Sequence, residues 1–370
     1  MSPANERAVE PLRAWMPIAR KVLTPLASVA LAVLIGSLIV KLSGGDPVAA
    51  SMALFSGAFG TPNQVGETLL RSTPLLIVGL GLAWGFRTGL FNIGAEGQLF
   101  VGGLVGAWLG LLLGGLTPWV SLPLLLLAGM AGGAAWAFVP AVLKAKVGAH
   151  EVITTMMFTY IARYLVSWLV VGPLKAPGPI PQTRQLPQSA ILPLLRDVSA
   201  ALPFGRAHLG IVIGVALAVV VWLLLKYTTL GYEARAVGFN PAAAENGGIS
   251  IAATTVKSLC ISGALAGLAG CIEVLGIHHR LFDQFSSGFG FTGIAVALLA
   301  KNHPLAVVPA AILFGALSAG ATTMQLEANV STKLISIIQG LVIFFVAAEA
   351  VVDWVIRARQ KKAVSADAAR

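Results

Sequence analysis

Long runs of apolar residues most limit what this chain can fold into. Most of them are about 20 residues long, the length that an α-helix needs to cross roughly 30 Å of hydrocarbon. They cover residues 23–42, 67–86, 95–115, 119–140, 152–172, 208–227, 256–276, 289–300, 304–323 and 333–356. Only 11% of the 370 residues are charged, whereas soluble domains carry about 25%. The pattern predicts an all-α, polytopic transmembrane helical bundle of about 10 spans and excludes a soluble protein.

Three parts follow from this pattern. Residues 1–22 precede the first span, residues 23–356 form the transmembrane domain, and residues 357–370 form a tail. The first run is longer than the apolar region of a signal peptide, about 7 to 15 residues, so we interpret it as a retained helix. The run at 289–300 is too short to cross a bilayer as a straight helix. It is expected to be re-entrant or half of a broken helix.

Lysine and arginine residues distinguish the two sides of the membrane, because cytoplasmic loops are enriched in both. With the N-terminus inside, sixteen fall on the inner side, eight on the outer side, and Arg163 lies within a span. Both termini are therefore predicted to be cytoplasmic. The Pro-rich loop, residues 173–207, is placed outside, and the loop at 228–254 inside. The basic residues cluster between apolar runs, which indicates contact with membrane lipid and not with nucleic acid.

Glycines recur at every fourth residue in one predicted span, at Gly102, Gly106, Gly110 and Gly114. Small residues at this spacing let helix backbones approach closely. Packing inside the molecule is the favoured interpretation, and a seam between two copies is the alternative.

A polar, glycine-rich stretch at residues 84–98 interrupts the apolar sequence. Helix ends exposed at such a break offer N–H and C=O groups to a substrate. Glu96 stands out, because a carboxylate inside a membrane is costly and indicates function. The alternative is that Arg87 and Glu96 border a short cytoplasmic turn, with Glu96 in a first helical turn, where the helix dipole favours it.

A second polar stretch, residues 278–291, precedes the short apolar run. Paired breaks in the two halves of a membrane protein point to a central binding site. The stretch begins with His278 and His279, which we expect to be solvated residues of an outer loop and not metal ligands.

The loop at 228–254 carries the strongest local signal. Residues 232–237 can form a short helix that Gly238 ends, and Pro241 is suited to open another helix after Asn240. Two short helices between glycine hinges make a compact segment, here named the knob, residues 231–250. The knob either docks in a groove of a soluble partner or remains an unpartnered loop.

Three runs, in this order, resemble one family: Phe91–Gln98, Gly231–Ser250 and Gly290–Leu299. They are similar to the permeases of bacterial ABC importers for nucleosides and simple sugars, a branch of the branched-chain amino acid permease superfamily. The resemblance extends from about Leu23 to Trp354. It implies an importer in the bacterial cytoplasmic membrane with two permease subunits, the second expected to be a paralogue, two cytoplasmic ABC ATPase domains and an extracytoplasmic substrate-binding lipoprotein.

In such importers the loop matching residues 233–248 transmits movements of the ATPase to the membrane helices. The resemblance assigns this coupling to Gly231, Glu233, Arg235, Gly238, Asn240, Glu245 and Gly248. None of the lysines has the glycines and the following Ser or Thr of a phosphate-binding loop. We therefore expect no cofactor on this chain and no enzyme activity, with ATP and Mg²⁺ bound by the partner ATPase.

The resemblance favours a nucleoside over a simple sugar as the substrate. Aromatic rings near the two breaks can stack on a nucleobase or sugar ring, or they serve only as packing residues. The predicted substrate-path residues are Phe91, Asn92, Glu96, Gln98, Phe289, Phe291 and Thr292.

Two other classes of protein were weighed. An ion-coupled secondary transporter commonly carries paired charged groups near the midplane, and here only Glu96, Glu273 and Arg163 are candidates. A membrane-embedded enzyme is disfavoured, because the sequence shows no convincing nucleophile or metal constellation.

Overall fold

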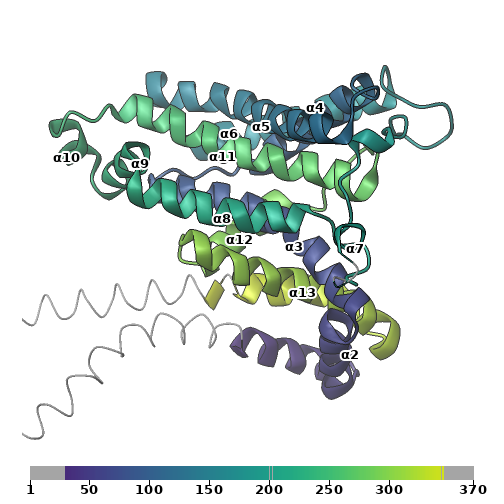
Figure 1. Cartoon of the computed structure of the whole chain (residues 1–370). Helices are drawn as coiled ribbons and strands as arrows, with labels where there is room; N and C mark the ends of the chain where they lie inside the picture. Colours follow the sequence, from purple (N-terminus) through teal and green to yellow (C-terminus); the bar gives the residue numbers. More distant parts are fainter. Residues whose placement is uncertain (1–29, 200, 202, 343, 346–370) are drawn as a thin grey trace, which may run out of the picture. The chain divides into compact units, whose positions relative to one another are not determined.

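The computed structural model describes residues 30–199, 201, 203–342 and 344–345, and nearly all regular structure in them is helical (Figure 1). Within these residues, seven helices are long and apolar enough to cross a membrane. These are α3 (Pro62–Arg87), α4 (Ala95–Leu112), α5 (Pro118–Val142, continued by the π-helical turn Leu143–Val147), α6 (Glu151–Val171), α8 (Gly210–Tyr227), α11 (Ile251–Glu273, continued by the π-helical turn Val274–His278) and α13 (Pro304–Ala328).

The remaining described helices are shorter. They are Ala30–Leu42, α2 (Pro47–Phe59), a 3₁₀ turn (Gln188–Ala190), α7 (Leu195–Val198), α9 (Thr229–Phe239), α10 (Pro241–Asn246), α12 (Phe289–Leu299) and Lys333–Val342. The described residues form no strand, only two isolated bridges, Gln182 with Phe282 and Leu194 with His208. The predicted all-α bundle is confirmed.

Most predicted spans match a helix to within a few residues at each end. The 11 residues of α12 reach only about 16 Å at 1.5 Å per residue, so this run does not cross a bilayer by itself, as its length predicted. The segments 1–22 and 357–370 lie outside the described residues, as do parts of the first and last predicted spans.

Helix α2 was not predicted, because its 13 residues are too few for a span and fell in an expected outer loop. A local signal was present. The Asp46 carboxylate accepts a hydrogen bond from the Val48 backbone N–H over 2.8 Å, and Pro47 occupies the first helical position. An acidic cap followed by proline is a common way to begin a helix.

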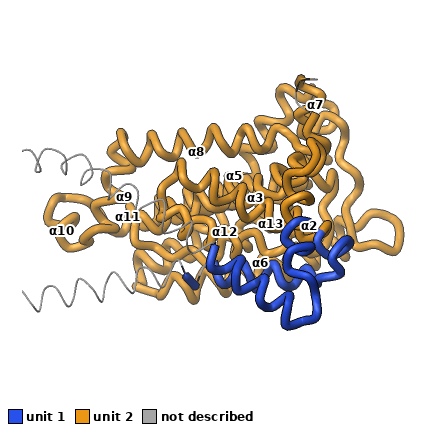
Figure 2. Tube along the Cα trace, turned by 90° about the horizontal axis from the view of Figure 1, so that it is seen from below, with its two compact units in different colours: residues 1–53, 324–370 blue, residues 54–323 orange. Residues whose placement is uncertain are grey.

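The chain divides into two compact units (Figure 2). One consists of residues 1–53 and 324–370 and the other of residues 54–323. In the first unit, Gly36 faces the Ile338 side chain at a distance that a Cβ could not keep, so the helices Ala30–Leu42 and Lys333–Val342 pack closely. The second unit holds every residue predicted to have a function.

Helix α11 forms the centre of the second unit and packs against α3, α4 and α5. Small residues make this possible: Gly102 lies against the Gly267 backbone, and Gly133 lies against Gly263 and Gly267. The predicted glycine face of α4 therefore packs inside the molecule. In their most apolar stretches, 83% of α3 is buried but only 22% of α5 and of α6. Helices α5 and α6 thus present most of their apolar surface outward, as lipid contact requires.

The knob and the Pro-rich loop lie at opposite ends of this unit, joined by α8 (Figure 1). The Pro-rich loop is mostly irregular, as its prolines predicted, but contains the 3₁₀ turn and α7. In the knob, Asn240 caps α10 by accepting a hydrogen bond from the Ala243 N–H over 3.1 Å, and Pro241 opens that helix as predicted.

One prediction for the knob was wrong. Gly238 does not end the first helix, since α9 runs from Thr229 to Phe239. The helix ends because Asn240 is extended, with φ −156° and ψ 101°, the conformation that a following proline favours. Gly238 has another use: a Cβ there would lie 2.9 Å from the Thr88 carbonyl carbon. Its missing side chain lets α9 pack on the end of α3.

Candidate functional site

The segment between α3 and α4, residues 88–94, runs back into the bundle along α11. The Thr88 hydroxyl donates to the Ser258 hydroxyl over 3.0 Å, and the Asn92 amide donates to the Ser262 hydroxyl over 2.9 Å. Ser258 and Ser262 are four residues apart on α11, a rise of about 6 Å. The interruption is therefore a segment of irregular backbone that runs inward and is enclosed by protein. Irregular backbone is tolerated at membrane depth where protein encloses it.

Two predicted substrate-path residues, Asn92 and Gln98, bind each other at this interruption. The Asn92 amide nitrogen donates to Gln98 Oε1 over 2.8 Å, and the Gln98 amide nitrogen donates to Asn92 Oδ1 over 3.1 Å. Each residue is 1% exposed. Asn92 also accepts from the Gly94 N–H. In this conformation the protein itself uses both amides, and Asn92 also binds Ser262.

Glu96 joins the two polar breaks that the sequence shows. It lies in the first turn of α4 and is 3% exposed. Its carboxylate accepts a hydrogen bond of 2.6 Å from the Gly290 N–H, in the first turn of α12. The preceding Gly288 has φ +88°, a conformation that favours glycine. Glu96 thus stands at the N-termini of two helices at once, where the helix dipoles favour negative charge.

The position of Glu96 bears on the alternative that it borders a cytoplasmic turn. It does occupy a first helical turn, but it lies inside the bundle and not on a surface turn. Arg87 is at the other end of α12, where its Nε donates to the Asn302 carbonyl over 3.0 Å. Glu96 and Arg87 therefore contact opposite ends of α12, and Arg87 lies at the end nearer the knob. Arg163 of α6 is within electrostatic range of Glu96 and donates to the Gln284 side chain over 3.2 Å.

The predicted aromatic residues do not form one cluster. Phe91 is 39% exposed, and its ring lies 4.7 Å from that of Phe86, centroid to centroid. Phe289 and Phe291 belong to the first turn of α12, where Phe291 is 41% exposed, and Phe289 and Thr292 are half-buried. The two aromatic groups belong to different breaks of the chain.

The knob contacts the start of the first break. Gly231 packs on the Leu225 backbone of α8 and donates its N–H to the Thr228 hydroxyl over 3.2 Å. The Glu233 carboxylate pairs with Lys257 of α11 at 3.3 Å. Of the other assigned residues, Glu245 lies in α10 and Gly248 has φ +82°. Through Gly238, α9 touches Arg87 and Thr88, the residues at which α3 ends.

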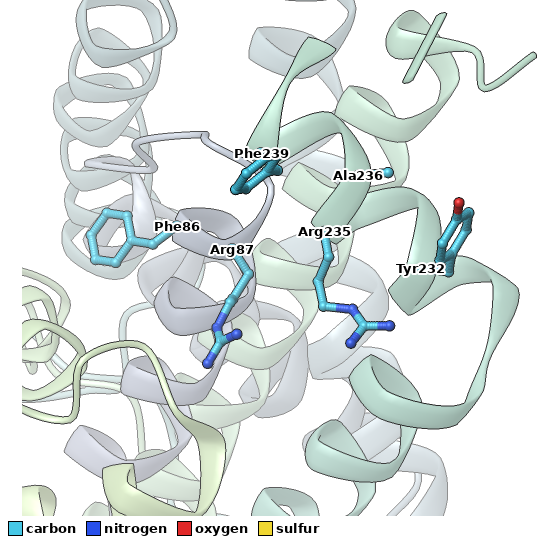
Figure 3. Close-up of a pocket in the computed structure, with 7 residues that line it drawn as sticks. Phe86, Arg87, Tyr232, Arg235, Ala236 and Phe239 are labelled. Carbon is cyan, nitrogen blue, oxygen red and sulfur yellow. The ribbon is translucent and has the colours of Figure 1, made fainter. Parts of the chain in front are cut away.

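A cavity of about 530 Å³ opens between α9 and the end of α3 (Figure 3). It is lined by Phe86, Arg87, Tyr232, Arg235, Ala236, Gly238 and Phe239. Phe239 is 94% exposed and Tyr232 62% exposed. Sequence reasoning selected only Arg235 and Gly238 of this group. Arg87 was interpreted only as the border of a turn and the others were missed, because the fold brings the last turn of α3 beside α9, which begins 142 residues further along the chain.

Histidines gather at the opposite end, beside the Pro-rich loop. His208 is 1% exposed, and its Nδ1 accepts from the Gly210 N–H over 3.0 Å. Burial, and secondarily the charge of His279, lower the pKa of His208 to about 4. His278 and His279 are half-buried and so are not simply solvated, contrary to expectation. Among the described residues no group of three or more His, Cys, Asp or Glu side chains is arranged to hold a metal ion.

Comparisons with known proteins agree with the resemblance in sequence. Residues 64–347 match the model of the branched-chain amino acid transport system permease component. The guanosine ABC transporter permease protein NupP of Bacillus subtilis is 39% identical over 92% of this chain and 97% of its own. The glucose ABC transporter permease protein TsgB13 of Haloferax volcanii is 35% identical, over 90% and 87%. The nucleoside ABC transporter permease protein NupB of Lactococcus lactis is 32% identical, over 90% and 93%. No solved structure matches this chain.

Proposed function

Because the chain belongs to the family of branched-chain amino acid transport system permease components, we propose that it is the permease subunit of an ABC importer and forms the path for a nucleoside. Relatives named for guanosine and for nucleosides support this substrate class. A relative named for glucose makes a simple sugar the second candidate.

One observation carries the mechanism: a continuous series of contacts leads from the knob to the buried break. Gly238 of α9 lies on Arg87 and Thr88. Residues 88–94 then run along α11 to Glu96, which holds the first turn of α12. The Arg87 side chain also donates a hydrogen bond to the carbonyl of Asn302, just beyond the last turn of α12. A displacement of α9 therefore acts on α12 at both of its ends.

Coupling requires that the two states of the permease differ in contacts that the driving partner can bias. In this proposal those contacts are the Glu96 to Gly290 hydrogen bond and the Asn92 to Gln98 amide pair. Their separation exposes two amides and the N–H groups of α12. With the aromatic rings of Phe289 and Phe291 in the first turn of α12, these groups suit the edges and faces of a nucleobase.

The driving partner in this proposal is a cytoplasmic ABC ATPase that binds ATP and Mg²⁺ and hydrolyses ATP. A second permease subunit completes the path, and an extracytoplasmic lipoprotein delivers the substrate. The knob end faces the cytoplasm of a bacterial cell, and the Pro-rich loop faces outward. The excess of Lys and Arg on the knob side supports this orientation.

Reconstitution tests the proposal. The chain, its co-encoded ATPase, second permease and binding protein are placed in liposomes with ATP inside, and uptake of labelled guanosine and of glucose is measured. We expect ATP-dependent guanosine uptake that an ionophore does not abolish. Glucose uptake without guanosine uptake would establish the sugar alternative. Uptake that needs no ATP and collapses with the ion gradient would overturn the ABC assignment.

A further inference from the structure

The cavity beside the knob contains two arginines and no acidic residue. Arg87 comes from the last turn of α3 and Arg235 from α9, and their side chains extend in the same direction (Figure 3). Each makes one backbone hydrogen bond through Nε, Arg87 to the Asn302 carbonyl and Arg235 to the Gly231 carbonyl. A guanidinium has five N–H donors, so each arginine retains donors beyond this bond, and both side chains line the cavity.

The nearby acid is already engaged. Glu233, on the same helix as Arg235, pairs with Lys257 at 3.3 Å. Within the described part of the chain neither Arg87 nor Arg235 has an acidic partner. Two like charges facing one cavity repel each other, and a carboxylate between them relieves this repulsion and can take two parallel hydrogen bonds.

Aromatic side chains border the same cavity. Phe239, at the last residue of α9, is 94% exposed, and Tyr232 is 62% exposed. Phe86 lines the side nearest α3. Exposed aromatic rings beside arginines are the composition that dominates binding energy in protein interfaces. The surface has the character of an interface whose partner is absent.

We infer that this cavity receives an acidic side chain of the ATPase partner, with Arg87 and Arg235 holding its carboxylate and Phe239 and Tyr232 packing beside it. The inference rests on the proposed function. A protein fits better than an anionic lipid, because α9 and α10 extend beyond the ends of α8 and α11, away from the apolar spans (Figure 1).

The position of Arg87 gives this contact a role in coupling. The same guanidinium that borders the cavity also holds Asn302, just after the end of α12. A carboxylate that draws Arg87 toward the partner therefore acts directly on the short helix. Arg235 has no such second contact, so its replacement tests docking with little effect on the helix break.

The test measures the affinity of the co-encoded ATPase for the assembled permease in nanodiscs of zwitterionic lipid, at low and high salt. Arg235→Glu is expected to weaken binding about 30-fold or more at low salt. Arg235→Lys, which keeps the charge, should weaken it only a few-fold. The matched control is Lys146→Glu, the same charge change at an exposed residue of the π-helical turn after α5, and it should bind as the wild type does.

A charge exchange identifies the partner residue. Carbodiimide labelling of ATPase carboxylates, with and without the permease, should show one carboxylate that becomes protected. Its replacement by lysine should restore binding to Arg235→Glu. Equal binding of the wild type and Arg235→Glu would overturn the inference while leaving the importer assignment intact. The inference would also be overturned if Arg235→Glu lost only the binding of anionic lipid and kept the binding of the ATPase. If the wild-type permease binds no ATPase, the proposed function fails first.

Discussion

The knob and the Pro-rich loop occupy opposite ends of the same unit but are held in different ways. The loop donates backbone N–H groups of Thr183, Leu186 and Leu192 to carbonyls of residues 275–281, and its Leu186 and Leu192 are no more than 3% exposed. The knob is held by glycine contacts, by buried side chains of α9 and by one partly exposed ion pair. The loop is thus anchored by several backbone hydrogen bonds, whereas the knob leaves arginines and aromatics open.

This difference indicates which end receives force. An element anchored by backbone hydrogen bonds to a neighbouring segment resists displacement, and an element with exposed arginines and aromatic rings gains contacts from a partner. The contrast suggests that the loop end serves as a fixed cover while the knob end responds to the ATPase. The variants below test the contrast, beginning with the largest expected effect.

Gly238→Val should separate α9 from the end of α3, because a side chain there would overlap the Arg87 carbonyl oxygen. We expect ATP-driven uptake to fall by up to about 100-fold, from an overpacking cost of up to about 3 kcal/mol. Gly115→Ala at the other end is the control, since a Cβ there meets nothing within 4 Å. Uptake by Gly238→Val at the wild-type rate would remove this contact from the coupling path.

Acid should weaken the loop end through His208. Its folded pKa of about 4 lies below the ordinary value of 6.5 because of burial and then His279. The unfolded chain therefore binds this proton at a higher pH, and the free energy of unfolding decreases as pH falls from about 6.5 to about 4, by at most about 3 kcal/mol. Thermal unfolding of His208→Asn across this range should show a shallower dependence on pH.

The control is His303→Asn at the knob end. Burial, and then Arg87, also lower the pKa of His303, but the residue is exposed. This variant should keep the wild-type dependence on pH. If the thermal stability of His208→Asn depends on pH as steeply as that of the wild type, another group governs stability in acid.

Glu96→Ala should loosen α12, which lies between the two ends, by removing the charged acceptor for the Gly290 N–H. The expected cost is about 2 kcal/mol, visible as faster hydrogen exchange at residues 289–293. Glu96→Gln retains an acceptor oxygen and should exchange at an intermediate rate. Unchanged exchange in the alanine variant would mean that the first turn of α12 is held by other contacts.

Glu233→Lys is expected to have the smallest effect on stability, below about 1 kcal/mol, because the ion pair with Lys257 is partly exposed. Its effect on transport should be larger, since it alters how the knob rests on α11. We expect normal membrane insertion with reduced uptake, and partial recovery in the double variant with Lys257→Glu. If uptake by the single variant equals that of the wild type, the ion pair plays no part in coupling.

The local elements were readable in the sequence because their causes are local. Apolar runs of membrane length gave the spans, and Asn240 with Pro241 gave the start of α10. The short run at 289–300 forms a helix of only 11 residues, as its length led us to expect. Helix α2 was missed for the opposite reason: its length is that of a loop segment, and only the Asp46 and Pro47 signal marked it.

The candidate site could be read only in pieces. Glu96 was singled out and Gly290 was noted only as the start of a run, but their hydrogen bond joins residues 194 positions apart, and nothing in either stretch specifies the other. Asn92 and Gln98 were expected to offer hydrogen bonds, and the structure shows that they satisfy each other. Arg87 was read as the border of a turn, and its place in the cavity depends on α9.

Apolar length and polar interruptions along the sequence by themselves determined that this protein is a bundle of membrane helices with two breaks and a knob between spans. Those properties depend on near neighbours in the chain and on the cost of exposing backbone to lipid. Only the tertiary structure decided that the two breaks meet at Glu96, that the knob rests on the end of α3, and that two arginines face one cavity. Such contacts depend on how glycine surfaces let distant helices approach, a property of packing in three dimensions.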